Sequence, residues 1–237
     1  MLLNLSRTWL PVARDITYLL SEITEGQVEA AVFQKIIGIN EDTMEIDPDG
    51  LFAAGSFLDQ QAACAAHAPI LKDHFSTDAY HQKIKAIVDK NAKREPVPLG
   101  DITDTLSKLD KDGYRLAVLT NDSEASARRS LDALNISSYF THIIGYDSGY
   151  GGKPDPTGFL AICSSCDVAP HNTIMIGDTS ADRLVAKAAG AGLFVGISAN
   201  YPAPTKALDG AQYLLPNIER LPELLKTLSL LSNKGFF

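Results

Sequence analysis

The sequence predicts an α/β fold, a doubly wound, Rossmann-like parallel sheet with a set of helices inserted after its first strand. Two observations support this class. From residue 102 onward, short apolar stretches alternate with amphipathic stretches, which indicates parallel strands joined by crossover helices that cover both faces of a sheet. Over residues 11–93, apolar side chains instead recur at steps of three and four, which indicates helices alone.

The N-terminal half is expected to contain a strand, a helical region and a linker. Residues 1–5 are a short apolar segment that we expect to be a strand. The helical region is interrupted at residues 47–50, Asp-Pro-Asp-Gly, whose Asp spacing resembles a calcium loop but whose proline and lack of later ligands favour a plain turn. After the linker at residues 95–100 the pattern changes. We therefore expect an α/β domain formed by residues 1–10 and 95–237 and an inserted helical domain formed by residues 11–94.

After the linker, the alternation assigns a range to each element. The expected strands lie at residues 114–120, 142–145, 173–176, 192–197 and 212–215. The expected helices lie at residues 102–109, 123–134, 157–166, 180–189 and 218–230. In an open sheet of this kind, ligands bind at the carboxyl ends of the strands, so the polar residues that follow the strands are the candidates for a site.

Composition narrows the function classes. The chain has 237 residues, 45% of them hydrophobic and 21% charged, which suits one α/β domain with a smaller lobe. Its net charge is -8 and its basic residues are scattered, so nucleic acid is not an expected partner. No apolar run approaches the roughly 20 residues of a membrane span, and residues 1–10 lack the features of a secretory leader. We expect a cytoplasmic protein with no membrane association.

The three cysteines, Cys64, Cys163 and Cys166, indicate no disulfide framework. Cys163 and Cys166 have the spacing of a redox pair, but they fall toward the end of an expected helix, whereas thiolate activation needs a helix N-terminus or a nearby cation. We interpret them as packing thiols in preference to a redox pair. The histidines are not grouped with the cysteines as in a zinc site.

Two carboxylates follow the strand expected at residues 173–176. Asp178 comes after a glycine, and Asp182 lies in the first turn of the next helix. Oxygen ligands at this edge of a sheet suit Mg²⁺, which is usually held by one or two carboxylates together with waters and a substrate phosphate. In the alternative interpretation, Asp178 is a turn residue and Asp182 balances the helix dipole.

Three further polar residues lie at or beyond strand ends. Thr120 and Asn121 end one strand and precede a helix, so a hydroxyl and backbone donors at a helix N-terminus are available to a phosphate group. Lys153 lies in a loop rich in glycine and proline, where a cation is suited to neutralise a phosphoryl oxygen. A single loop lysine is more often solvated, so it is the combination with the two carboxylates that indicates a phosphate site.

These segments resemble motifs of the haloacid dehalogenase superfamily, and within it of the phosphoglycolate-phosphatase-like branch. The resemblance is closest over residues 95–197. Three segments look like the family's second, third and fourth motifs: Tyr114-Arg-Leu-Ala-Val-Leu-Thr-Asn121, Gly152-Lys-Pro-Asp-Pro156 and Ile176-Gly-Asp-Thr-Ser-Ala-Asp182. The helical region from Pro11 to Lys93 is similar to the family's cap in position and character.

The resemblance implies a phosphoryl-transfer mechanism. An aspartate after the first strand would attack phosphorus, and a second aspartate two residues later would protonate the leaving group and then activate water. Mg²⁺ would be held by the nucleophile, by the backbone carbonyl of the second aspartate and by Asp178, with Asp182 in support. Thr120, Asn121 and Lys153 would bind the phosphoryl group, and the substrate would be a small phosphorylated metabolite.

The first motif departs from this pattern. The family's Asp-x-Asp-x-Thr is expected at the end of the first strand, where this chain has Asn4-Leu-Ser-Arg-Thr8. Asn4 would replace the nucleophile, and Ser6 would replace the acid/base residue and offer its carbonyl to Mg²⁺. An amide is a poor nucleophile, and a hydroxyl does not donate a proton as a carboxyl group does, so we expect weak or absent turnover and weakened Mg²⁺ binding. Arg7 replaces a glycine and is expected to point into solvent.

Three explanations of this departure stay open. The chain is a natural non-catalytic relative, an engineered or mis-started version of an active enzyme, or a protein whose residues 1–5 are a core strand that does not align with the motif. The retained Thr8 argues against the last explanation. A rival hypothesis is a regulatory member of the family that engages a protein partner. A dehalogenase is less favoured, since such enzymes also need the aspartate nucleophile.

Overall fold

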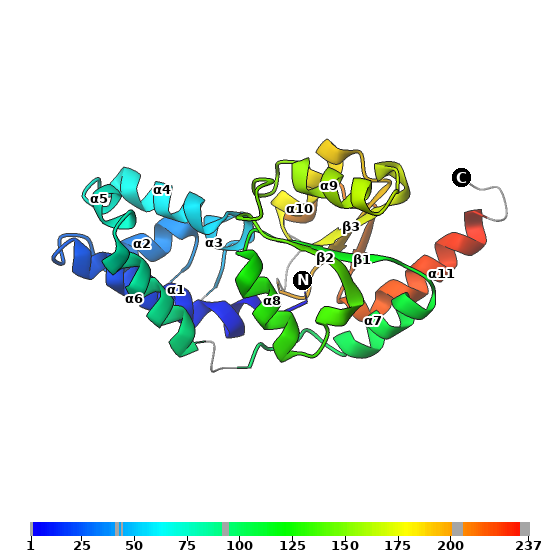
Figure 1. The fold of residues 1–237 in the computed structure, drawn as a ribbon, viewed down its shortest axis with the longest axis horizontal. Helices are drawn as coiled ribbons and strands as arrows, with labels where there is room; N and C mark the ends of the chain where they lie inside the picture. The colour runs from blue at the N-terminus through cyan, green and yellow to red at the C-terminus, as the bar shows by residue number, and fades with distance from the viewer. Residues whose placement is uncertain (1, 41–42, 44, 92–94, 201–205, 233–237) are drawn as a thin grey trace.

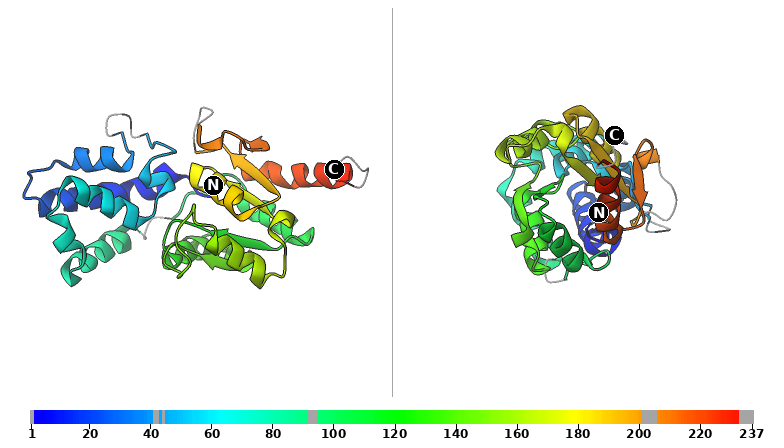
Figure 2. Two further views of the ribbon diagram at one scale, coloured as in Figure 1. Left: turned by 90° about the horizontal axis from the view of Figure 1, so that it is seen from above. Right: turned by 90° about the vertical axis from the view of Figure 1, so that its right-hand side faces the viewer.

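The computed structural model describes residues 2–40, 43, 45–91, 95–200 and 206–232. These residues form a helical lobe and an α/β part, which lie side by side along the long axis of the molecule (Figure 1). The view from above in Figure 2 shows the same separation, with the strands confined to the α/β part. The α/β class predicted from the sequence is confirmed.

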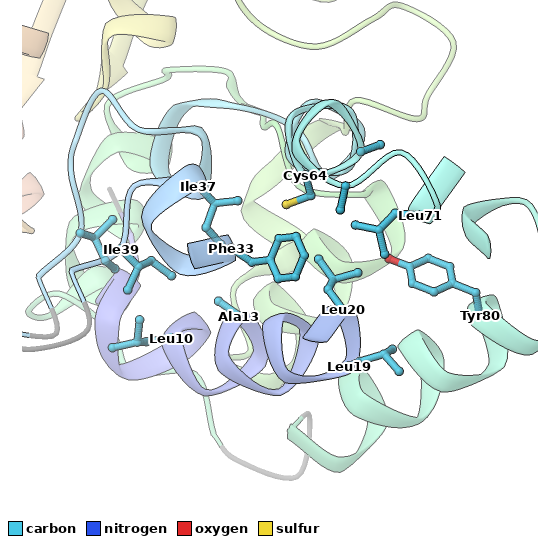
Figure 3. Close-up of a cluster of buried hydrophobic side chains, with 13 residues drawn as sticks. Leu10, Ala13, Leu19, Leu20, Phe33, Ile37, Ile39, Cys64, Leu71 and Tyr80 are labelled. Atoms are coloured by element: carbon cyan, nitrogen blue, oxygen red, sulfur yellow. The ribbon is translucent and has the colours of Figure 1, made fainter. Parts of the chain in front are cut away.

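The helical lobe closes around one apolar core. Its helices are α1 (Leu5–Ile23), α2 (Ala30–Ile37), α3 (Leu51–Ala54), α4 (Phe57–His67), α5 (Leu71–Phe75) and α6 (Asp78–Asn91). Phe33 and Leu71 have no exposed surface, and helices α1, α2 and α4 contribute most of the side chains around them (Figure 3). The buried amide of Gln34 donates a hydrogen bond to the Thr17 hydroxyl 3.2 Å away, which ties α2 to α1.

Two expectations for this region can be compared with the lobe. Helix α1 begins at Leu5, before the expected start of the helical domain at residue 11, and the expected end at residue 94 lies outside the described residues. The segment at residues 47–50 is a plain turn, in which the Asp49 amide donates to Asp47 Oδ1 at 3.0 Å and the Gly50 amide donates to the Asp47 carbonyl at 2.9 Å.

The α/β part follows the alternation expected from the sequence. In order it contains α7 (Ile102–Lys111), β1 (Leu116–Leu119), α8 (Glu124–Ala133), β2 (Phe140–Ile144), α9 (Thr157–Ser165), β3 (Ile174–Gly177), α10 (Ser180–Ala189), β4 (Leu193–Ile197), β5 (Tyr213–Leu215) and α11 (Leu221–Ser232). Val195 and Ile197 of β4 are fully buried in the core of the α/β part. None of the helices, as far as they are described, is long and apolar enough to cross a membrane.

The strands pair in two groups, β1 with β2 and β4 with both β3 and β5, and each pairing is parallel. No pairing between β1 and β3 occurs among the described residues. The strand expected at residues 1–5 is wrong for the described part of that range, because Leu3 forms only an isolated bridge with Pro98 and α1 already begins at Leu5. The physical reason is a helix cap: the Asn4 side chain accepts a hydrogen bond from the Arg7 amide at 2.9 Å.

A cavity of about 930 Å³ lies along the facing edges of β1 and β3. Consecutive residues of both strands line it, residues 113–123 on one side and 172–179 on the other. Since neighbouring side chains on a strand point to opposite faces, such unbroken runs mean that the strand edges themselves face the cavity. None of the β1 residues is buried, whereas every residue of β4 except Leu193 is buried. The cavity therefore separates the two groups of strands and reaches the polar residues at their carboxyl ends.

The three cysteines are buried and form no disulfide. Burial raises the pKa of Cys163 and raises the pKa of Cys64 to about 11. The burial of both side chains agrees with the interpretation of Cys163 and Cys166 as packing thiols.

Candidate active site

The polar residues that the sequence analysis selected at strand ends line one cavity. Thr120 and Asn121 follow β1, Asp178 follows β3, Asp182 lies in the first turn of α10, and Lys153 lies in the loop between β2 and α9. Within each group the strands run parallel, so the residues that follow them lie at the carboxyl edge of that group, and the cavity between the two groups brings the two sets together.

Lys153 and Asp182 form a buried ion pair at the wall of this cavity. Lys153 Nζ donates to Asp182 Oδ1 at 2.6 Å, and the two side chains are only 11% and 5% exposed. Burial by itself raises the pKa of Asp182, but the charge and hydrogen bond of Lys153, together with the Thr179 hydroxyl, outweigh it and hold the pKa below its ordinary value. Asp182 is therefore ionised at neutral pH and holds the ammonium group in place.

The second oxygen of Asp182 closes the N-terminus of α10. Oδ2 accepts hydrogen bonds from the Thr179 hydroxyl at 2.8 Å and from the backbone amides of Asp178 and Thr179 at 3.1 Å each. Thr179 is the N-cap residue, and the two side chains form a capping box. Gly177 allows this close approach, because a Cβ at that position would overlap the Asp182 side chain. Asp182 thus stabilises the helix and also holds Lys153.

Asp178 is almost buried, with 8% of its surface exposed, and it is linked to the start of α1. Asn200 Nδ2 donates to Asp178 Oδ2 at 2.8 Å and to the Leu3 carbonyl at 3.2 Å, while Asn200 Oδ1 accepts from the Leu5 amide at 3.1 Å. Asn200 was not among the candidates expected from the sequence. It lies three residues beyond the end of β4, so the criterion that selected Thr120, a polar residue after a strand, would have found it.

The side chains of Thr120 and Asn121 have different surroundings. Thr120 Oγ1 accepts a hydrogen bond from the Asp122 amide at 3.1 Å, which keeps this hydroxyl group at the cavity wall. Asn121 instead contacts backbone groups: Oδ1 accepts from the Lys153 amide at 2.7 Å, and Nδ2 donates to the carbonyls of Lys153 at 2.9 Å and Ala54 at 2.7 Å. Asn121 was expected from the sequence to bind phosphate, but its side chain is hydrogen-bonded to backbone groups of other residues.

Asp122 is a second residue of the cavity wall that the sequence analysis missed. Burial raises its pKa to about 6, although hydrogen bonds from Ser126 and from the Ser123 amide, the latter at 2.8 Å, act in the opposite direction. Its position directly after the Thr-Asn pair was visible in the sequence, but its burial was not.

Comparison with known proteins assigns the family. The model of the haloacid dehalogenase-like hydrolases matches residues 58–195, which is more than half of the 237 residues. The chain belongs to this family. The match covers the strand ends that carry Thr120, Lys153, Asp178 and Asp182.

Relatives of this haloacid dehalogenase-like chain include phosphoglycolate phosphatases. Phosphoglycolate phosphatase 1 of Pseudomonas aeruginosa is 33% identical over 149 residues, which cover 60% of this chain and 54% of the relative. A probable phosphoglycolate phosphatase of Pseudomonas putida is 35% identical over 125 residues, 50% of each chain. The chain spans about half the length of the curated relatives it matches.

Solved structures of haloacid dehalogenase-like proteins share the fold. A predicted phosphoglycolate phosphatase from Haemophilus somnus superimposes with a TM-score of 0.67 at 19% identity, over 92% of both chains. A HAD phosphatase from Thermococcus onnurineus gives a TM-score of 0.64 at 19% identity, over 95% of this chain and 93% of the other. At these identities the likeness establishes the fold alone.

The two residues assigned to the nucleophile and acid/base positions of the family's first motif are not part of the cavity lining. Leu2, Leu3 and Leu5 line the cavity, whereas Asn4 and Ser6 do not. Asn4 caps α1, and Ser6 is exposed on its first turn, so the expectation that they stand at the end of a strand is wrong. Their assignment to the nucleophile and acid/base positions stays a prediction. Arg7 is exposed, as expected.

The donor set at the strand ends partly fits Mg²⁺. Asp178 offers hard carboxylate oxygens beside the cavity, which is the ligand type that Mg²⁺ prefers. Asp182 differs, because its oxygens already accept hydrogen bonds from Lys153, Thr179 and backbone amides. Within the described ranges, no three His, Cys, Asp or Glu side chains are grouped closely enough to form a protein-only metal site. The remaining ligands would then be waters and substrate oxygens.

Proposed function

We propose that this haloacid dehalogenase-like protein is a phosphohydrolase scaffold that binds the phosphate group of a small phosphomonoester at the carboxyl ends of β1 and β3. The observation that carries the proposal is the buried Lys153–Asp182 pair, which shares one cavity with Thr120 and Asp178. An ammonium group has three N–H donors, so Lys153 can donate to a phosphoryl oxygen while it keeps its contact with Asp182.

Each residue has a distinct role in this proposal. Lys153 neutralises one phosphoryl oxygen, and the Thr120 hydroxyl donates to another. Asp178 holds Mg²⁺, which would supply charge neutralisation of the phosphate when bound. Asn200 orients Asp178 through its 2.8 Å hydrogen bond. Asp182 keeps the Lys153 ammonium group at the wall, so that the cation is in position before the anion arrives.

We further propose that turnover is weak or absent. Asn4 and Ser6 stand where the first-motif aspartates are expected from the sequence, and neither supplies a carboxylate. The placement of both side chains outside the cavity lining supports this proposal. General acid–base catalysis by a positioned carboxyl group contributes about 10²–10⁴-fold to a rate, so its loss alone would reduce turnover strongly.

The helical lobe is proposed to act as the cap, with residues 11–94 covering the site and selecting the substrate. The names of the relatives make 2-phosphoglycolate the first phosphomonoester to examine. A cytoplasmic location is proposed on the basis of the sequence analysis.

Calorimetric titration with inorganic phosphate, with and without Mg²⁺, tests the binding site. Lys153→Met should weaken phosphate binding about 10- to 100-fold, the effect of removing a charge-assisted hydrogen bond. Lys153→Arg, which keeps the charge, should retain more affinity, and circular dichroism should show that Lys153→Met is still folded under the conditions of the titration. Lys85→Met removes an exposed lysine from the helical lobe and should leave the affinity unchanged. Phosphate binding that is absent, or equal in all four proteins, would overturn the proposal.

Phosphate release from a panel of phosphomonoesters, starting with 2-phosphoglycolate, tests the proposed loss of turnover. The chain should release phosphate slowly or not at all, and a variant with Asn4→Asp and Ser6→Asp should be no faster, because both side chains lie outside the cavity lining. If the unmodified chain turns over at a rate ordinary for a phosphatase, then another carboxylate performs the chemistry and the assignment of Asn4 and Ser6 is wrong.

A further inference from the structure

The Asn121 amide connects three separate segments of the chain. It follows β1, and its side chain contacts the backbone of Lys153, 32 residues later, and of Ala54, 67 residues earlier. Ala54 is the last residue of α3 in the helical lobe, and Lys153 lies in the loop that carries the cation of the site. The amide therefore lies where the helical lobe meets the phosphate site.

The hydrogen bonds determine which way the amide faces. Oδ1 accepts from the Lys153 N–H at 2.7 Å, while the two protons of Nδ2 reach the carbonyls of Lys153 and Ala54 at 2.9 and 2.7 Å. If Oδ1 and Nδ2 of Asn121 were exchanged, the Nδ2 donor would face the Lys153 N–H donor. Oδ1 would then face the carbonyl oxygens of Lys153 and Ala54, acceptor against acceptor. The three contacts are thus satisfied in one orientation only.

Both backbone polar groups of Lys153 are bonded to this one side chain. The loop between β2 and α9 has no helix or strand, so its backbone depends on contacts of this kind for its position. The Lys153 side chain then extends to Asp182 Oδ1, 2.6 Å away. A continuous series of hydrogen bonds therefore runs from Ala54 through Asn121 and Lys153 to Asp182 and the N-terminus of α10.

We propose that Asn121 is a positioning residue that holds Lys153 in the phosphate site and makes its position depend on the docking of the helical lobe through Ala54. This inference rests on the proposed function for the role of Lys153, but it concerns how the lysine is held. The Asn121 side chain itself does not bind phosphate. Movement of the α3 end away from the site would break one of the three hydrogen bonds and loosen Lys153.

Reductive methylation of lysines followed by mass spectrometry reads the position of Lys153 without any turnover. Lys153 is 11% exposed and should react slowly in the unmodified chain, while Lys85, which is 76% exposed, serves as the internal reference. Asn121→Ala should raise the labelling of Lys153 relative to Lys85 about fivefold or more, as expected for the loss of two hydrogen bonds to its backbone. Gln61→Ala is the matched control, because the Gln61 amide donates to Tyr80 Oη at 3.2 Å within the helical lobe, and its loss should leave this ratio unchanged.

A double-mutant comparison tests the link to the helical lobe. A Cβ on Gly55, which follows Ala54, would lie 2.8 Å from the Leu51 carbonyl oxygen, so Gly55→Ala should displace the end of α3. This substitution should raise Lys153 labelling in the unmodified chain but add little in the Asn121→Ala background. Additive effects would show that Asn121 does not transmit the position of α3, and unchanged labelling in Asn121→Ala would overturn the positioning role itself.

The outcomes separate this inference from the proposed function. Raised labelling in Asn121→Ala combined with absent phosphate binding in the unmodified chain would retain the positioning role and reject the phosphate site. If phosphate binds to the unmodified chain, Asn121→Ala should weaken it less than Lys153→Met does, because the cation is displaced and not removed. Equal or greater weakening in Asn121→Ala would show that the Asn121 side chain contacts the anion directly and would overturn the inference.

Discussion

Lys153 Nζ lies 2.6 Å from Asp182 Oδ1, and this single contact joins the loop after β2 to the first turn of α10. Both side chains are nearly buried, so neither charge is well solvated. Removing one partner of a buried ion pair destabilises a protein far more than replacing both partners by apolar residues, because the remaining charge stays buried without a partner. The pair is therefore the natural starting point for perturbing the site.

Replacing Lys153 by Met should lower the free energy of unfolding by about 3–5 kcal/mol, since Asp182 would be left as an uncompensated buried charge. The double variant Lys153→Met and Asp182→Asn should recover part of this loss. Urea denaturation followed by circular dichroism measures both. The matched control is Lys85→Met in the exposed Lys85–Asp89 pair, which should change stability by about 0.5 kcal/mol or less. Equal effects at the two pairs would contradict the buried character of the site.

Replacing Asp122 by Asn should stabilise the protein in a way that depends on pH. Burial raises the pKa of Asp122 to about 6, from an ordinary value of 3.8, so the folded state favours the protonated carboxyl group. Stability from this group is fully present below pH 3.8 and is lost as pH rises through about 6. The Asn side chain stays neutral, so the variant should gain about 1–3 kcal/mol at pH 8 and almost nothing near pH 4. Melting temperatures of the unmodified chain and of Asp122→Asn, measured from pH 4 to 8, test this expectation. A difference between the two proteins that does not change with pH would contradict the raised pKa of Asp122.

Replacing Gly177 by Ala should disrupt the capping box of α10. The added Cβ would overlap the Asp182 side chain, and relieving that overlap would pull the carboxylate away from Thr179 and Lys153. We expect a loss of about 3 kcal/mol or more, from overpacking together with the lost cap. Gly190→Ala at the other end of the same helix is the control, because its φ of +72° strains an alanine but nothing lies within 4 Å of the new Cβ. That variant should lose only about 1–2 kcal/mol, and thermal denaturation of the two variants should show a clear difference.

Backbone amides of β1 should exchange with solvent faster than those of β4. The β1 residues are not buried and one edge of the strand faces the cavity, whereas β4 is paired on both sides and is almost entirely buried. Local opening is easier where few apolar contacts cover the backbone. Hydrogen exchange followed by mass spectrometry of peptides over residues 114–120 and 192–198 measures the difference. Equal protection of both segments would mean that the β1 edge is covered in solution.

Most of the α/β elements were predictable because their signals are local. The helix expected at residues 180–189 is found at Ser180–Ala189, and the strand expected at residues 173–176 is found at Ile174–Gly177. For the helix these signals are the cap residue Thr179, the apolar face and the C-cap Gly190, and for the strand an apolar run that ends at Gly177. The segment at residues 1–5 was not predictable in this way. Its apolar residues suit a strand, and residues 2–4 do pair with residues 97–99 in an isolated bridge, but the Asn4 cap starts α1 at Leu5 and ends this extended segment.

The composition of the site was only partly predictable. Position after a strand was enough to select Thr120, Lys153, Asp178 and Asp182, which line the same cavity. It did not reveal that Asp182 pairs with Lys153, or that Asn121 bonds to Lys153 and Ala54. Hydrogen-bond partners depend on distances between segments far apart in the chain, and sequence spacing contains no such distances.

The sequence by itself determined the α/β class, the order of strands and helices after residue 102 and the polar residues at the strand ends, because periodicity and turn chemistry act over a few residues. Only the tertiary structure decided that β1 and β3 flank a cavity and that Lys153 and Asp182 are buried together. Burial and pairing arise when distant segments pack, and this packing turns a loop lysine and a first-turn acid into the ion pair on which the site depends.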